Sequence, residues 1–193
     1  MAAPDGTTRA LRADAKANHD RLLEVAAEAF ARDGAEASLK AIAKEAGVGI
    51  GTLYRRFPTR EILVEATYRS ESARLCASAD DLLGHLPAVE ALRAWMEQFL
   101  DYLATKRGMA EALRVVLTAD DDLRLRTRGM LIDALGLLLR TSEEQGAVRR
   151  GLDPADVVMA LGGIALITSD QGRQDLAGRL LDLLMAGLVN GGD

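Results

Sequence analysis

The sequence predicts an all-α protein with a small N-terminal domain and a larger C-terminal domain. Only 4 of its 193 residues are proline, and apolar residues recur at intervals of three and four, which places them on one face of a helix. Hydrophobic residues make up 49% of the chain and charged residues 27%, so the chain can bury a sizeable core. We expect about nine helices, with a three-helix N-terminal domain over residues 16–64 and a helical C-terminal domain over residues 65–193.

The first helix is expected over residues 16–33. Gly34 follows it, at a position suited to a left-handed helix cap. The preceding residues 1–15 contain Pro4 and several charges and lack the apolar core of a secretory signal, so we expect them to form a flexible arm. Five apolar residues share the buried face of this helix: Leu22, Val25, Ala26, Ala29 and Phe30.

Two short helices joined by a glycine turn follow. The first begins after Ser38, whose hydroxyl can accept a hydrogen bond from the exposed amides of the first helical turn, and it ends at Gly47. The second, Ile50–Arg56, has little room before Pro58. Two short helices joined by a turn that contains glycine form a helix-turn-helix. We therefore predict that Ile50–Arg56 is a recognition helix for the major groove of DNA, which is roughly 12 Å wide.

The outer face of this recognition helix carries the predicted DNA contacts. Its apolar residues share the opposite face: Ile50, Leu53 and Phe57. We predict base contacts for Thr52, Arg55 and Arg56, because arginine on guanine is the commonest specific pairing; arginines directed at phosphate or solvent fit the pattern nearly as well. The residues left for the outside are Gly49, Gly51, Thr52, Tyr54, Arg55 and Arg56.

The distribution of charge permits DNA binding. The formal net charge is −5, but residues 1–60 carry 10 Lys and Arg against 8 Asp and Glu, whereas the rest of the chain carries 14 against 21. Salt at physiological concentration screens charges over roughly 8 Å. A locally basic surface can therefore face phosphate while the acidic residues lie farther away.

This region also resembles a known family. The matching segments are SLKAIAKEAGV at residues 38–48, GTLY at 51–54, FPTRE at 57–61, and Leu63. Together they resemble the DNA-binding domain of TetR-family regulators, and the match covers residues 18–64. Several unrelated requirements coincide in register, which makes the signal specific.

The resemblance implies particular contacts with DNA. It assigns phosphate contacts to Tyr54 and to Arg60, and it leads us to expect Ser38 and Lys40 at the DNA as well. The family often has serine where Gly49 stands, so one phosphate contact is missing here. The alternative for Tyr54 is that its ring packs against the first helix while its hydroxyl lies in water.

Beyond Thr59 we expect further helices separated by glycine and proline residues. Their expected bounds are residues 60–83, from Pro87 up to Gly108, 109–118, 121–144, 154–169 and 173–188.

The last two helices are the expected dimer interface. Apolar residues surround the helix at residues 154–169 on nearly every side, and Gly162 and Gly163 permit close helix approach, so we predict that a second subunit covers it. The alternative is a central buried helix in a monomer. A twofold homodimer would place its recognition helices about one turn of double-stranded DNA apart, on a palindromic operator. The predicted interface residues are Val157, Leu161, Ile164, Leu176, Leu180 and Leu184.

The C-terminal domain is similar to that of the SbtR-like subgroup, through residues 104–113 and 162–165. This resemblance implies a cavity for a small-molecule effector, whose binding releases a repressor from its operator. A repressor without an effector is the alternative. The candidate lining residues are large or pliable, and each of them also fits plain core: Trp95, Phe99, Tyr102, Met109, Met130 and Leu131.

Other functional classes find little support. The two histidines, His19 and His85, cannot form a metal triad, Cys76 is the single cysteine, and no glycine-rich phosphate loop or nucleophile elbow occurs. We expect no enzymatic activity, cofactor or metal. The longest uncharged run has 13 residues, below the roughly 20 of a membrane span, and the lone cysteine suits a reducing cytoplasm. The alternative function is a helical small-molecule carrier or a protein adaptor that does not bind DNA.

Overall fold

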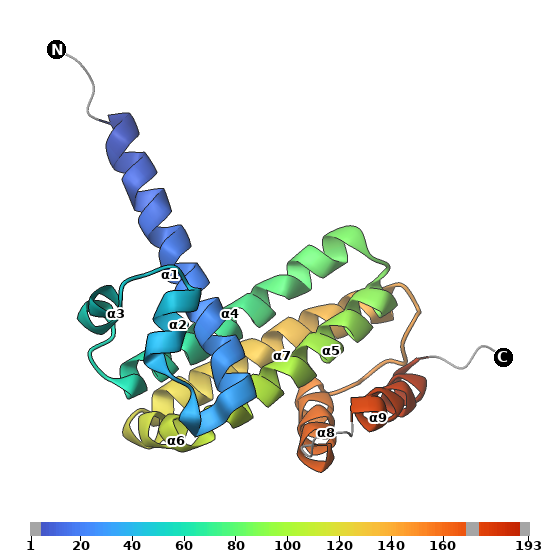
Figure 1. Cartoon of the computed structure of the whole chain (residues 1–193). Coiled ribbons are helices and arrows are strands. Elements are labelled where there is room, and N and C mark those ends of the chain that lie inside the picture. Colours follow the sequence, from blue (N-terminus) through green and yellow to red (C-terminus); the bar gives the residue numbers. More distant parts are fainter. Residues whose placement is uncertain (1–4, 169–173, 190–193) are drawn as a thin grey trace. The chain divides into compact units, whose positions relative to one another are not determined.

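The structure is a computed structural model that describes residues 5–168 and 174–189. Within these residues the chain forms nine α-helices and one short 3-10 helix, η1, and this confirms the all-α prediction. Figure 1 shows the arrangement of the α-helices along the chain. The helices are α1 (Asp5–Asp33), α2 (Leu39–Glu45), α3 (Ile50–Arg56), α4 (Arg60–His85), α5 (Ala88–Gly108), α6 (Ala110–Ala119), α7 (Asp121–Glu144), α8 (Pro154–Ile167) and α9 (Gln174–Leu188), and η1 is Gly34–Glu36.

Helix α1 begins earlier than the sequence analysis expected. The predicted start was residue 16, but the helix begins at Asp5. The flexible arm expected over residues 1–15 stays a prediction, and residues 1–4 lie outside the described part of the chain. Residues 5–15 contain alanine, leucine and arginine, which favour helix. The other end of α1 agrees with the prediction, because Gly34 has a φ of 56°.

The chain folds as two compact units. In the described residues, 5–71 and 105–119 form one, called the N-terminal unit below, and 72–104, 120–168 and 174–189 form the other, called the second unit. The expected division at residue 64 differs from this one, because α6 packs with η1 in the N-terminal unit. A Cβ atom at Gly108 would overlap the Phe30 carbonyl oxygen, so the end of α5 lies directly against α1.

The core of the N-terminal unit joins α1, α2, α3 and α4. Phe30 of α1, Ile42 of α2 and Leu53 of α3 are all fully buried. Val25 is only half-buried, unlike the rest of the predicted face of α1. This packing holds the two short helices, α2 and α3, against the long helix α1. Isolated helices of seven residues would not be stable in water, so α2 and α3 depend on this packing.

The second unit is held by both apolar and polar contacts. The indole Nε1 of Trp95 in α5 donates to the Leu75 carbonyl oxygen of α4 at 2.8 Å. The hydroxyls of Ser72 and Tyr102 lie 3.1 Å apart and join the same two helices. On the surface, Arg93 of α5 pairs with Asp182 of α9 at 2.7 Å. These contacts connect the first helices of this unit with its last.

We predict that Gly108→Ala destabilises the protein by about 1–3 kcal/mol, because the added methyl group meets the α1 backbone rather than a flexible side chain. Urea unfolding measures the effect. The matched control is Gly129→Ala inside α7, where an added Cβ meets nothing within 4 Å and helix propensity favours alanine by about 0.5–1 kcal/mol. Equal stabilisation by both substitutions would contradict the close approach of α5 to α1.

Candidate DNA-binding and regulatory sites

The helix-turn-helix begins at a capped residue and turns at a glycine. The Oγ of Ser38 accepts a hydrogen bond from the Ala41 amide at 3.4 Å and thus caps α2. Gly47 has a φ of 73°, and the next amide, that of Val48, donates to the Ala43 carbonyl oxygen at 2.9 Å. Because residues with a side chain rarely adopt this backbone conformation, the turn depends on glycine.

Burial separates the inner and outer faces of α3 as predicted, with one exception. Leu53 and Phe57 are buried, but Ile50 is 39% exposed, which corrects its assignment to the buried face. Ile50 is the first residue of a helix of only seven residues. The other predicted contact residues on α2 and α3 are all exposed: Ser38, Lys40, Gly49, Gly51, Thr52, Tyr54, Arg55 and Arg56.

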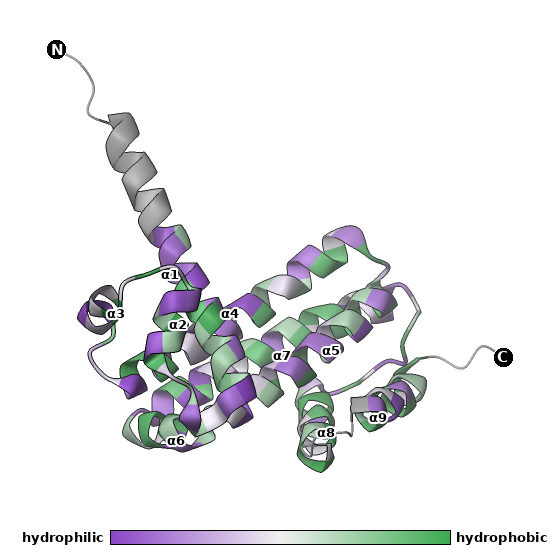
Figure 2. Cartoon of the chain, in the orientation of Figure 1, coloured by the Kyte–Doolittle hydropathy of each residue, from purple (hydrophilic) through white to green (hydrophobic). Residues whose placement is uncertain are grey.

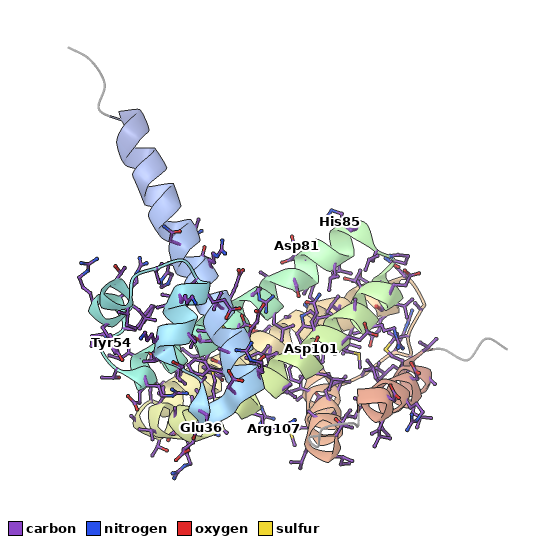
Figure 3. All side chains as sticks on the ribbon, in the orientation of Figure 1. Glu36, Tyr54, Asp81, His85, Asp101 and Arg107 are labelled. Carbon is purple, nitrogen blue, oxygen red and sulfur yellow. The ribbon has the colours of Figure 1, made fainter. Side chains whose placement is uncertain are left out.

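Tyr54, labelled in Figure 3, is 49% exposed. Half of its side chain is therefore accessible to a ligand outside the helix. Gly49 and Gly51 flank this face, and an added Cβ at Gly51 would meet nothing within 4 Å. Two glycines therefore lie at the start of α3 beside the exposed Ile50, and longer polar side chains follow toward its end.

Arg60 has partners inside the N-terminal unit. Its guanidinium donates to the Ala37 carbonyl oxygen at 2.7 Å and to the Gly34 carbonyl oxygen at 3.1 Å, and it lies 5.1 Å from the centre of the Phe30 ring. Two of the five N–H donors of an arginine are used in this way. The side chain therefore fastens the start of α4 to the connection between α1 and α2. Its implied phosphate contact stays a prediction.

His19 is a residue whose role the sequence analysis missed. Its ring stacks on Phe57, directly after α3, with the ring centres 5.8 Å apart and the planes at 17°. Its Nδ1 is buried without a hydrogen-bond partner. Burial, together with the charge of Arg56, lowers the pKa of His19 below its ordinary value, while Asp20 acts weakly in the opposite direction. The neutral imidazole is thus part of the support beneath α3.

We predict that acid destabilises the protein through His19. The unfolded chain takes up this proton near pH 6.5, whereas the folded chain resists it, so stability is lost as the pH falls below that value. His19→Phe keeps an aromatic ring on Phe57 but cannot titrate. Thermal unfolding between about pH 7 and about pH 5 should therefore show a smaller fall in Tm for this variant than for the natural chain.

The control for this experiment is His85→Gln. His85 is exposed at the end of α4, where its Nδ1 lies 2.7 Å from the Asp81 carbonyl oxygen, and both residues are labelled in Figure 3. This variant should keep the pH profile of the natural chain. Identical profiles for the natural chain and His19→Phe would show that His19 carries no pH-dependent stability.

Comparison with protein families identifies the protein. A family model described as bacterial regulatory proteins of the tetR family matches residues 22–67, and one described as the C-terminal domain of SbtR-like transcriptional regulators matches residues 87–190. The chain belongs to the TetR family. Both resemblances that the sequence suggested are thereby confirmed. The protein is a DNA-binding transcriptional regulator, as is typical of this family.

Two solved structures share the whole fold. A TetR transcriptional regulator from Streptomyces coelicolor is 46% identical over 90% of this chain and 99% of that one, with a TM-score of 0.84. A TetR transcription regulatory protein from Mycobacterium vanbaalenii is 31% identical over 93% and 99%, with a TM-score of 0.75. An HTH-type transcriptional regulator of Staphylococcus aureus is 46% identical over 54 residues, so this chain spans only 29% of that relative's length.

The predicted ligand-lining residues of this TetR-family chain do not all lie together. Trp95, Phe99 and Tyr102 form a buried row on α5, with successive ring centres 5.4 and 6.0 Å apart. Met109 is also buried, but it belongs to the N-terminal unit, whereas the row belongs to the second unit. Leu131 is buried in α7, but Met130 is 46% exposed, which corrects its assignment to an interior cavity. Neighbours on a helix point in different directions, and the sequence alone did not show which of the two faced inward.

Three of the predicted dimer residues lie on α8, and their role in dimerisation stays a prediction. Val157, Leu161 and Ile164 are buried within the chain, where α8 packs against α7 and α9. The exposed apolar residues of α8 are others, and Leu166 is 73% exposed. Figure 2 shows hydrophobic residues around most of α8, so the sequence could not decide which stripe its own chain covers. The exposed set on the last two helices is Met159, Leu166 and Ile167 of α8 and Leu183 of α9.

The residues predicted on α9 are placed differently. Leu176, Leu180 and Leu184 are half-buried, which leaves part of each side chain for another molecule. Their role in dimerisation stays a prediction.

Two further findings concern the part of the chain that the structure describes: no helix there could span a membrane, and no cluster of three or more His, Cys, Asp or Glu side chains could hold a metal ion.

Proposed function

We propose that this TetR-family regulator is a homodimeric repressor that binds a palindromic operator in the cytoplasm and leaves it when a small-molecule effector binds. The observation that supports operator binding is the outer face of α3, where Thr52, Tyr54, Arg55 and Arg56 are all exposed while Leu53 is buried beneath them. A short helix presented in this way fits the major groove, and the glycines at its start allow close approach.

The exposed residues divide into two proposed roles. Thr52, Arg55 and Arg56 lie on α3 itself and would contact base edges. Tyr54, together with Ser38 and Lys40 at the start of α2, would contact phosphates and so fix the register on the duplex. For Arg60 we propose a supporting role through its two carbonyl partners, to which a phosphate contact would be an addition.

We predict that Arg55→Ala relaxes preference at one base position, at a cost of about 1–3 kcal/mol in discrimination, because a bidentate contact with one base is lost. Lys40→Ala should instead weaken binding to all sequences about equally. It should also reduce the slope of log affinity against log salt concentration by about one, because one fewer counterion is released. Fluorescence anisotropy with DNA that flanks the coding region, over a salt series, measures both effects. A flat salt response without a preferred sequence would favour the carrier or adaptor alternative.

A second copy of the chain is the proposed occupant of the apolar surface on α8 and α9. TetR-family regulators are typically dimers. Gly162 and Gly163 lie on α8 among the exposed apolar residues, and an added Cβ at either would meet nothing within 4 Å. A partner helix could therefore approach the α8 backbone closely. In a twofold dimer the same stripe meets itself, so each exposed apolar side chain is covered in both copies.

We predict that Leu166→Glu weakens both dimerisation and operator binding without unfolding the chain, because Leu166 is exposed in the single chain. Ile164→Glu should instead unfold the second unit, since that side chain is buried. The matched control is Leu125→Glu, at an exposed leucine of α7. Analytical ultracentrifugation and anisotropy give the two measurements, and an intact dimer with full operator affinity in Leu166→Glu would remove this interface.

The proposed effector would act through differential affinity. A ligand releases a repressor only if it binds the conformation that does not fit the operator better than the one that does. The buried aromatic row of α5 lies in the second unit and is the part of the predicted lining that the structure brings together. We propose that the effector binds beside this row.

A further inference from the structure

A pocket that the proposed function does not use lies in the second unit. It is formed by the connection between α7 and α8, by the start of α8 and by the end of α9, all of which belong to the second unit. Its volume is about 470 Å³, which lies within the usual range for small-molecule sites. Its floor is aliphatic, and Val157 of α8 and Leu188 of α9 are buried there.

The connection that forms the rim is held in one conformation. Val148 forms an antiparallel bridge with Val189, and the Arg149 amide donates to the Leu188 carbonyl oxygen at 2.9 Å. Gly151 has a φ of 79°, and its amide donates to Glu143 Oε1 at 3.1 Å. These contacts fasten the rim to the ends of α7 and α9, so the pocket exists before any ligand arrives.

Two arginines, Arg149 and Arg150, lie at the rim of this pocket, and the lining also contains two aspartates, Asp153 and Asp156. Arg149 and Arg150 are exposed, and within the described residues no hydrogen bond or ion pair engages either guanidinium. The acids at the pocket are differently placed. Asp153 Oδ1 accepts from the Ala155 amide at 2.8 Å and caps α8, and Asp156 lies in the first turn, where the helix dipole stabilises a negative charge.

We propose that this pocket binds a small amphipathic anion, with an oxyanion head held by Arg149 and Arg150 and an aliphatic tail over Val157, Leu184 and Leu188. A guanidinium offers a planar pair of donors that matches carboxylate and phosphate oxygens, so both head groups share the required chemistry. The tail removes apolar surface from water against a floor that contains only aliphatic side chains.

The binding test needs no DNA, so its failure and the failure of operator binding are distinguishable. The full chain is titrated with octanoate, octyl phosphate, octylamine and octanol by calorimetry, and methyl NMR follows Val157 and Leu188. At least one of the two anions should bind and shift both methyl signals, whereas octylamine should not bind and octanol should bind at least ten-fold more weakly. Comparison of octanoate with octyl phosphate decides between a carboxylate and a phosphate head.

Variants locate the site. Arg149→Gln with Arg150→Gln should weaken anion binding at least ten-fold, and Ala160→Trp, which fills the pocket from α8, should abolish it. The control for lost charge is Arg124→Gln with Arg128→Gln on the exposed side of α7, which should bind as the natural chain does. The proposal is overturned if no probe binds, which is the result expected if a second copy of the chain covers the pocket. It is also overturned if octylamine binds as well as the anions, or if the variant with both Arg149 and Arg150 replaced keeps full affinity for the anions.

Discussion

The left-handed turn at Gly47 is the constraint on which the DNA-binding surface depends. Its φ of 73° lets the chain turn in the four residues between α2 and α3, so that Val48 still bonds back to α2 before α3 begins. A residue with a Cβ in this conformation costs roughly 1–2 kcal/mol. Once the turn is set, burial of Leu53 fixes the rotation of α3 about its axis, and the exposed side chains follow from that rotation.

The support beneath this surface comes from residues distant in the sequence. Arg60 joins the start of α4 to the carbonyl oxygens after α1, and His19 stacks beneath the residue that ends α3. Gly108 brings the end of α5 against α1. Helix α6 therefore belongs to the same compact unit as the helix-turn-helix. A displacement of α6 would act directly on the helices that carry α3.

The features that sequence could predict are those set by short-range chemistry. The cap at Ser38, the turn at Gly47 and the bounds of α3 each depend on neighbouring residues, and all three agree with the structure. The stripe of α8 that faces its own chain is a long-range choice among equivalent apolar sides, so the burial of Ile164 within the single chain could not be predicted. The stacking of His19 on Phe57 joins residues far apart in sequence, and no local pattern signals it.

The chain passes between the two units at three points. Two crossings, at residues 71–72 and 104–105, lie inside the continuous helices α4 and α5. The third, at residues 119–120, lies between α6 and α7, where Asp120 caps α7 through the Leu123 amide. A sharp kink in a continuous helix disrupts its ladder of hydrogen bonds, whereas a connection between helices changes its dihedral angles at little cost. The two units are therefore joined by two continuous helices and by one connection, around Asp120, whose dihedral angles can change at lower cost.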